Sequence, residues 1–251
     1  MRTGIAVLAT AALCCGCATR ETVQFTPKAQ QDTLVRDGQP ALVSRGKNSL
    51  VLVRPASRQF ASRGRPVFVV AMSNLSRAPI QFRVANVQAA ENVNGQLASI
   101  RVITYEELVN EERSRQVAAA ILTGLAAGAN AAAASQAGHY NSQSTVYTPR
   151  GAYTVNTTGY SPTANAIAQS NAAAQNEAMI ASAVEQGQRN MAMLEGGVIK
   201  DNTLLPGEWY GGQLHLNPLA SDSSPTGRTY SITLLVGTDR HDINIVQAPT
   251  Q

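Results

Sequence analysis

Cysteine is almost absent from this 251-residue chain, whose three cysteines, Cys14, Cys15 and Cys17, all lie near the N-terminus. A chain that begins at Cys17 has no cysteine pair to form a disulfide and no thiolate cluster to bind a metal. Its stability must come from the burial of apolar side chains. A chain of this length can form one large domain or two small ones around a hydrophobic core.

Aromatic residues make up 5% of the chain and charged residues 14%, whereas alanine is abundant. At least one region must therefore pack through small side chains. The formal net charge of +4 says little about partners. Nine basic residues lie between Leu34 and Ala90, where Asp37 is the only acid. We interpret them as solvated positions rather than as a surface for anionic lipid or polysaccharide. Aromatic residues do not interleave with them, so no nucleic-acid partner is expected.

Recognisable catalytic motifs are also lacking. The sequence contains no Gly-x-Ser-x-Gly, no Walker loop, no dinucleotide fingerprint and no nucleophile paired with a base at a known spacing. His139, His215 and His241 are too scattered to predict a metal site. The run from Asp239 to Asp242 contains reactive residue types, but we interpret it as a loop cluster before a strand. The sequence therefore predicts a protein that is not an enzyme and that binds no cofactor or metal.

The first residues have the pattern of an export signal. Arg2 supplies a positive charge, Ile5 to Leu13 form a short apolar stretch, and Cys14-Cys15-Gly16-Cys17 is a small-residue cleavage zone that ends in cysteine. This segment resembles the signal peptide of bacterial lipoproteins. The resemblance implies removal of residues 1–16 and attachment of a diacylglyceryl group to the thiol of Cys17. Cys15 is an alternative lipidation site, and an ordinary secretory signal cut near Ala18 is the competing interpretation.

Most of the chain after this signal has the pattern of β-structure. Residues 17–39 are polar and weakly patterned, and we predict a lipid-proximal tether there. Residues 40–104 and 197–251 contain short runs with alternating apolar and polar side chains, separated by turn signals such as Asn94-Gly95. Together the two regions supply about seven to nine strands, enough for one immunoglobulin-like antiparallel β-sandwich built from both ends of the chain.

Two long helices are predicted between these β-rich regions, over residues 105–196. The first should begin after Thr104, which forms a capping box with Glu107, and should end near Gly138. The second should begin with Ser161 as N-cap and end at Gly196-Gly197. Its apolar residues at helical spacing are Ile167, Met179, Ile180, Val184, Met191 and Leu194. The fold class is therefore α+β, a β-sandwich interrupted by a long α-helical hairpin.

A tyrosine-rich segment, residues 139–160, connects the predicted helices. Tyr140, Tyr147, Tyr153 and Tyr160 recur every six or seven residues. Thr148-Pro149-Arg150-Gly151 could turn a small hairpin between two β-prone runs, and a disordered linker is an equal alternative. Exposed tyrosines would make this segment a contact surface.

Two small groups of residues are candidate contact sites. Gly124 and Gly128, spaced as Gly-x-x-x-Gly in an alanine-rich helix, form a candidate assembly face, because small residues let helix backbones approach closely. We expect the two helices to pack on each other through alanine rather than to span a membrane. Trp209 and Tyr210 are candidate ligand contacts, although a buried Trp after a turn is the favoured interpretation.

These expectations combine into a function of the structural class. The sequence predicts a lipid-anchored cell-envelope protein, in the outer membrane facing the periplasm, with a structural or protein-interaction role. The outer-membrane assignment follows from the resemblance to lipoproteins, in which a residue such as Ala18 after the lipidated cysteine implies outer-membrane sorting. The expected partners are the membrane, through the lipid, and an envelope protein or further copies of this chain. A polysaccharide-binding module is the alternative.

Overall fold

The structure is a computed structural model that describes residues 20–36, 38–61, 64–93, 95–218 and 228–249. The chain divides into two compact units. The β unit comprises residues up to Ile103 and from Ile199 onward, and the helix unit comprises Thr104–Val198. The sequence had placed the insertion at 105–196. Cys17, the predicted lipidation site, lies outside the described residues.

The β unit is built from antiparallel strands and one short 3₁₀ helix, Val84–Asn86. In the described part of the chain the strands are β1 (Arg20–Thr26), β2 (Gln31–Arg36), β3 (Gln39–Arg45), β4 (Ser49–Pro55), β5 (Phe60–Ala61), β6 (Val67–Asn74), β7 (Ile80–Phe82), β8 (Gln88–Val93), β9 (Gln96–Ile103), β12 (Asn202–Leu204), β13 (Trp209–Asn217), β14 (Arg228–Val236) and β15 (Asp239–Pro249).

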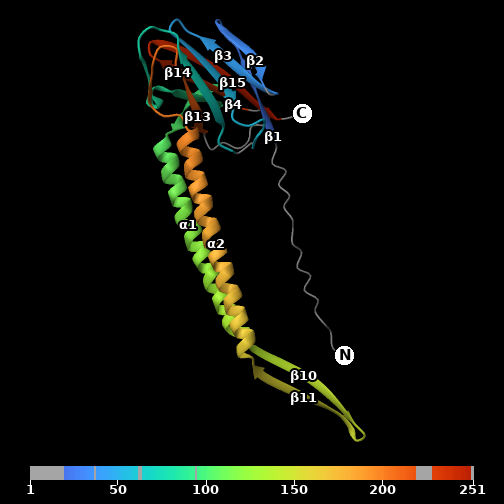
Figure 1. The fold of residues 1–251 in the computed structure, drawn as a ribbon. Coiled ribbons are helices and arrows are strands. Elements are labelled where there is room, and N and C mark those ends of the chain that lie inside the picture. The colour runs from blue at the N-terminus through green and yellow to red at the C-terminus, as the bar shows by residue number, and fades with distance from the viewer. Residues whose placement is uncertain (1–19, 37, 62–63, 94, 219–227, 250–251) are drawn as a thin grey trace. The chain divides into compact units, whose positions relative to one another are not determined.

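The strands follow one hydrogen-bonded order, β2-β3-β4-β6-β13-β9-β8-β14-β15-β1-β5, with β7 paired to β14 and β12 paired to β7. Strand β9 connects the two halves of this order. Its residues up to Ile100 pair with β8, whereas Arg101–Ile103 pair with β13. The architecture is therefore an antiparallel sandwich or barrel in which strand β9 belongs to both sides. Together with the two helices, it confirms the predicted α+β class. Both ends of the chain contribute strands, as Figure 1 shows by colour.

One hydrophobic core lies inside the β unit. Strand β4 alternates buried and half-buried residues along its whole length, as expected for a strand with one face toward a core. The core contains residues from both halves of the strand order, including Phe68, Met72 and Leu214 on one side and Phe82, Ile232 and Ile243 on the other. All six are at most 1% exposed. Gly95, the second residue of the predicted turn, lies between β8 and β9 at a φ of 86°, and Asn94 lies outside the described residues.

The predicted tether is wrong for residues 20–36, which form β1 and β2. Strand β1 pairs with the C-terminal strand β15, with Glu21 opposite Pro249 and Val23 opposite Gln247. Figure 1 shows β1 beside β15 although they come from opposite ends of the chain. The local pattern of this segment is weak because its order comes from a partner more than 200 residues away in sequence.

The helix unit consists of α1 (Tyr105–Gln136), a two-stranded ribbon of β10 (His139–Thr148) and β11 (Gly151–Tyr160), and α2 (Pro162–Gly197). The predicted caps are present. The Thr104 hydroxyl accepts from the backbone N–H of Glu107, whose carboxylate accepts from the N–H of Thr104. Ser161 caps α2 by accepting from the N–H of Ala164. The predicted tyrosine-rich segment is an ordered ribbon that turns between Thr148 and Gly151.

The points where the helix unit leaves and re-enters the β unit are set by one strand. Ile103, the last residue of β9, pairs with His215 of β13. The backbone N–H of Ile199 donates to the carbonyl of Gln213 on the same strand, over 3.0 Å. The two residues that flank the insertion therefore contact positions two residues apart along β13.

Candidate functional site

The seam between α1 and α2 is polar. Asn130 donates to Asn176 over 3.0 Å, and Asn176 in turn donates to the carbonyl of Ala127 over 3.2 Å. Near the ribbon, the buried Asn165 side chain donates to the carbonyls of Ala134 and Ser135, both over 3.1 Å. The helices therefore run antiparallel and are held by amide side chains that bond across the seam.

A buried carboxylate lies at the other end of this seam. Glu112 is 4% exposed and accepts from Asn190 Nδ2 over 2.9 Å and from Gln116 Nε2 over 3.4 Å, and the Arg115 guanidinium is 3.6 Å away. The amide of Gln116 also donates to the carbonyl of Gly187 over 3.1 Å. A buried charge needs such partners, and this one has them from both helices. The apolar residues beside these polar groups are mostly small, such as Ala119, Ala120 and Ala183.

Four large apolar side chains of α1 point away from α2 and into solvent. Val117, Ile121 and Leu125 follow one another at intervals of four residues, which places them on one side of the helix, and Leu122 lies beside them. Their exposed fractions are 62%, 60%, 67% and 67%. At 100° per residue, this row lies opposite the seam residues Gln116, Ala127 and Asn130. We call these four side chains the outer face of α1. The large apolar side chains of this part of α1 therefore face solvent, whereas amides and small residues face α2.

Gly124 and Gly128 lie on this outer side. A Cβ built at either glycine has no atom of the chain within 4 Å. They are therefore not what lets α1 approach α2. That role belongs to Gly187, where a Cβ would lie 3.0 Å from the Gln116 side chain. The sequence had predicted alanine-based packing of the two helices, and Ala134 and Ala172 are indeed buried in the helix unit. The two Gly-x-x-x-Gly residues remain open to an external partner.

Among the described residues, α1 is the single helix long and apolar enough to cross a membrane by length and composition, and 6% of its most apolar stretch is buried. The partner helix carries Glu177, Glu185 and Arg189 on exposed positions. Because α2 is bonded along α1, a membrane crossing by the pair would carry these charges into the bilayer, at high cost.

The β10–β11 ribbon is exposed along its length, with ten successive pairs from His139–Tyr160 to Thr148–Gly151. Its base is fixed to α2, because the N–H of Ser161 donates to the carbonyl of Gly138 over 2.8 Å and the His139 and Tyr160 rings lie 5.0 Å apart. Side chains alternate between the two faces of a ribbon. Tyr140, Val146, Tyr153 and Val155 share one face, whereas Asn, Gln and Thr side chains dominate the other.

Trp209 and Tyr210 do not form a joint platform. They are neighbours at the start of β13 and therefore point to opposite faces of the strand. Trp209 is 56% exposed, so the favoured interpretation of a buried Trp is wrong. Tyr210 packs against the core, and its hydroxyl donates to the carbonyl of Lys200 and accepts from the N–H of the same residue. Tyr210 thus fixes the chain after α2, and Trp209 alone remains a candidate contact.

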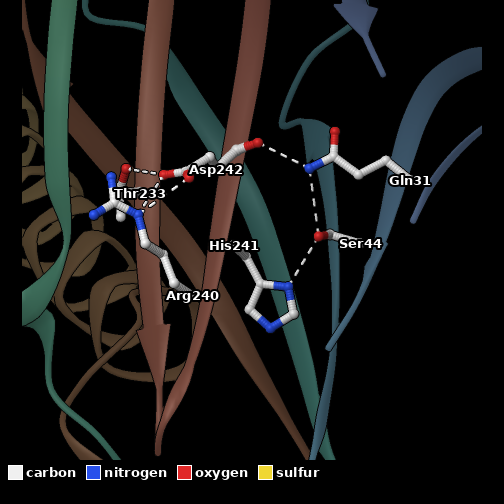
Figure 2. A network of polar contacts seen from close by, with 6 residues as sticks. All are labelled: Gln31, Ser44, Thr233, Arg240, His241 and Asp242. Atoms are coloured by element: carbon white, nitrogen blue, oxygen red, sulfur yellow. Dashed lines mark hydrogen bonds and ion pairs between the residues drawn. The ribbon is translucent and has the colours of Figure 1, made fainter. Parts of the chain in front are cut away.

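A buried polar network joins the two sides of the β unit around His241 of β15 (Figure 2). The imidazole lies between two serines, with Nδ1 2.9 Å from the hydroxyl of Ser44 and Nε2 2.9 Å from that of Ser49. Ser49 donates to the carboxylate of Asp239 over 2.9 Å, and Ser44 accepts from Gln31. Because Ser49 donates its one proton to Asp239, it accepts from Nε2–H, and in a neutral imidazole Nδ1 then accepts from Ser44. The network is complete with a neutral imidazole.

Burial lowers the pKa of His241 below its usual 6.5, against the opposing effect of Asp239 and Asp242. The imidazole is 1% exposed, and Ser44 and Ser49 are 5% and 0% exposed. A histidine between two hydroxyls has the groups that a proton relay uses, but all three side chains are buried from solvent. Asp239 also accepts from the N–H of Asn48 over 2.6 Å. The arrangement therefore fixes the β3–β4 turn to β15.

The interpretation of residues 239–242 as a loop cluster is wrong, because they are the first residues of β15. Asp242 lies on the face opposite His241, where it accepts from Thr233 and from Arg240 (Figure 2). Burial raises the pKa of this carboxyl, but the hydrogen bonds from Thr233 and Arg240 outweigh that effect and lower it. Because side chains alternate along β15, Asp239 belongs to the inner network of His241, whereas Asp242 forms an ion pair with Arg240 on the opposite face.

A second buried polar cluster was not predicted. Arg228 of β14 lies 3.7 Å from Glu91 of β8, with both side chains less than 10% exposed. Gln247 of β15 donates to Glu21 of β1. Burial raises the pKa of the neighbouring Tyr230 to about 12, with Arg228 opposing the shift. In the sequence, Glu91, Arg228 and Gln247 stand at strand positions where the alternation calls for an apolar residue. That pattern indicates buried polar groups, but it does not show that these residues lie close together.

Comparisons of the chain with models of protein families, with curated proteins and with solved structures find no match. Within the described residues, no group of three or more His, Cys, Asp or Glu side chains could hold a metal ion. A proposal on function therefore depends on three features of the structure: the polar side chains between the helices, the apolar outer face of α1 and the exposed ribbon.

Proposed function

We propose that this chain is a lipid-anchored cell-envelope protein that assembles with protein partners through its helix unit, while an immunoglobulin-like β unit serves as the scaffold at the anchored end. The outer face of α1 carries this proposal. A helix in water normally places its apolar side toward its partner. Here the seam holds amides and a carboxylate, and the apolar row faces outward.

The size of the exposed apolar row is enough to drive association. Covering the four side chains of the outer face would contribute about 1–2 kcal/mol each, because each keeps about two thirds of its surface in water and full burial of such a side chain contributes about 1.5–3 kcal/mol. The sum is about 4–8 kcal/mol per chain. Anchoring in one membrane reduces the freedom that association must remove, so a modest apolar contact suffices.

The anchor itself is supported by the resemblance of residues 1–17 to lipoprotein signals. A single lipid-modified Cys17 followed by Ala18 fits outer-membrane sorting, with the protein facing the periplasm. Strand β1 begins at Arg20, three residues after Cys17, so the β unit is the part of the chain closest in sequence to the lipid.

Polysaccharide binding is less well supported. That alternative relies on Trp209 and Tyr210 acting together, and the hydroxyl of Tyr210 is occupied by the backbone of Lys200. An exposed Trp209 alone gives one stacking surface and no built pocket.

The outer face can be tested by paired substitutions in the full-length chain. Ile121→Gln with Leu125→Gln replaces two apolar contacts by residues of at least equal helix propensity, so the helix should remain. Crosslinking of intact envelopes should then lose the partner bands that the unchanged chain gives. The matched control is Ile180→Gln with Val184→Gln, two positions on α2 with exposed fractions of 51% and 55%. Equal crosslinking in all three chains would contradict the proposal.

A further inference from the structure

Charged residues are nearly absent from residues 116–176 of the helix unit. From Gln116 to Asn176 the sequence contains one charged residue, Arg150, although 14% of the whole chain is charged. Most positions of this segment are exposed. Protein surfaces that meet only water usually carry interspersed charges of both signs, which keep copies apart. A long exposed segment without them is typical of a surface that is covered in the working assembly.

The ribbon within this segment has two open edges. In the described part of the chain, β10 pairs with β11 and with no other strand, so the outer backbone groups of both strands have no strand partner. Proteins usually protect such edges with lysine, proline or a bulge. Here the ten pairs run without a bulge, and Pro149 and Arg150 lie in the turn rather than on an edge.

We propose that the β10–β11 ribbon pairs edge to edge with the ribbon of a second copy of this chain, β10 of one copy beside β11 of the next. This inference rests on the proposed assembly function and names its partner. The ribbon is antiparallel, so a β11 strand added beside β10 continues the same antiparallel order. Each copy then keeps one free edge for a further copy, which builds a ring or a row.

The chemistry of the ribbon favours a second copy over an unrelated partner. In this arrangement β10 of one copy meets β11 of the next, and a second copy offers an open edge of the same ten-residue length. Neither strand carries a Lys, Arg, Asp or Glu, so no pair across the new edge would repel. A two-stranded ribbon alone is marginal in water, whereas three or more strands with a shared apolar face are stable. Tyr140, Val146, Tyr153 and Val155 would supply that face.

Cysteine pairing between copies tests this register. Gln143 and Asn156 lie opposite each other within the ribbon. One full-length chain carries Gln143→Cys and a second carries Asn156→Cys, and the two are produced together in the same envelopes. A thiol crosslinker that spans about 8 Å reaches both directly opposed and diagonal residues of paired strands. We expect a dimer band at least five times stronger with both variants present than with either alone, with the unchanged chain as baseline. No increase on mixing would overturn the inference.

Added charge provides the second measurement. Gln143→Lys with Thr145→Lys places two cations on β10, and we expect assembly of ribbons to be lost. Gln175→Lys with Gln188→Lys adds the same charge to exposed positions of α2 and should leave it unchanged. If the α1 variant Ile121→Gln with Leu125→Gln removes envelope crosslinking while the ribbon lysines do not, the assembly function stands and the ribbon inference is refuted.

Discussion

Replacing Gly124 and Gly128 by leucine should stabilise the helix unit and weaken its assembly. Both glycines lie inside α1, and a Cβ at either position meets no atom within 4 Å. Glycine in a helix interior costs about 1 kcal/mol relative to the best helix formers, and leucine is one of these. The double variant should therefore gain about 1–2 kcal/mol in the free energy of unfolding of the helix unit.

Assembly should change in the opposite direction. Two leucine side chains on the outer side of α1 would keep the backbone of a partner helix from approaching, and such overpacking costs about 1–3 kcal/mol per site. A loss of about 3 kcal/mol corresponds to a roughly hundredfold weaker association. Stability is measured by thermal or denaturant unfolding of the detergent-solubilised chain, and association by light scattering and by envelope crosslinking.

The matched control is Gly187→Leu, the same substitution on the seam. There a Cβ would already lie 3.0 Å from Gln116, whose amide bonds the Gly187 carbonyl. This variant should unfold at lower denaturant concentration. If the Gly124 and Gly128 double variant assembles as the unchanged chain does, the two glycines are merely tolerated on a solvated helix, and the reasoning from open space to a partner is refuted.

Three further predictions address the anchor, the His241 network and the two units. Cys17→Ser should release the protein from the membrane or leave it unprocessed, and mass spectrometry that finds an unmodified N-terminus at Ala18 in the unchanged chain would contradict lipidation. Burial holds the pKa of His241 below 6.5, so the unfolded chain takes up the extra proton. The unfolding free energy should therefore fall as the pH drops below 6.5, as denaturant curves at pH 7.5 and 5.5 will show, and His241→Gln should flatten that dependence. Replacement of residues 105–196 by a short linker should leave the β circular dichroism intact, because both ends of the insertion contact β13, and a chain that no longer unfolds cooperatively would argue otherwise.

The helix unit was predictable from sequence where its signals are local. The capping box of Thr104 and Glu107 and the Ser161-Pro162 start depend on residues three or four positions apart, and both are present. The turn at Thr148 to Gly151 is equally local. The orientation of the helices is different, because it depends on which side of each meets the other. Ile167, Ile180 and Val184, which recur at helical spacing, lie more than half exposed, and the seam is formed by amides instead.

The first strands of the β unit and its polar clusters could not be predicted from the sequence, because they depend on contacts between distant residues. Strands β1 and β2 have weak alternation, and β1 takes most of its pairing from the distant β15, with a short contact to β5. His241 is almost 200 positions from Ser44 and Ser49 in the sequence, so their contact depends on how the two sides of the β unit pack. Asp239 looked like a loop residue because it follows the turn at Gly237, whereas it is the first residue of a strand.

The pairing of β1 with β15 has a consequence for how the protein is made. Strand β1 is synthesised long before β15, because the two strands are separated by more than 200 residues. Their pairing can form only after the helix unit and strand β14 have been made, and pairings of such large sequence separation make folding slow. Under the proposed export of this chain, the same delay would keep the β unit open while the chain crosses a membrane.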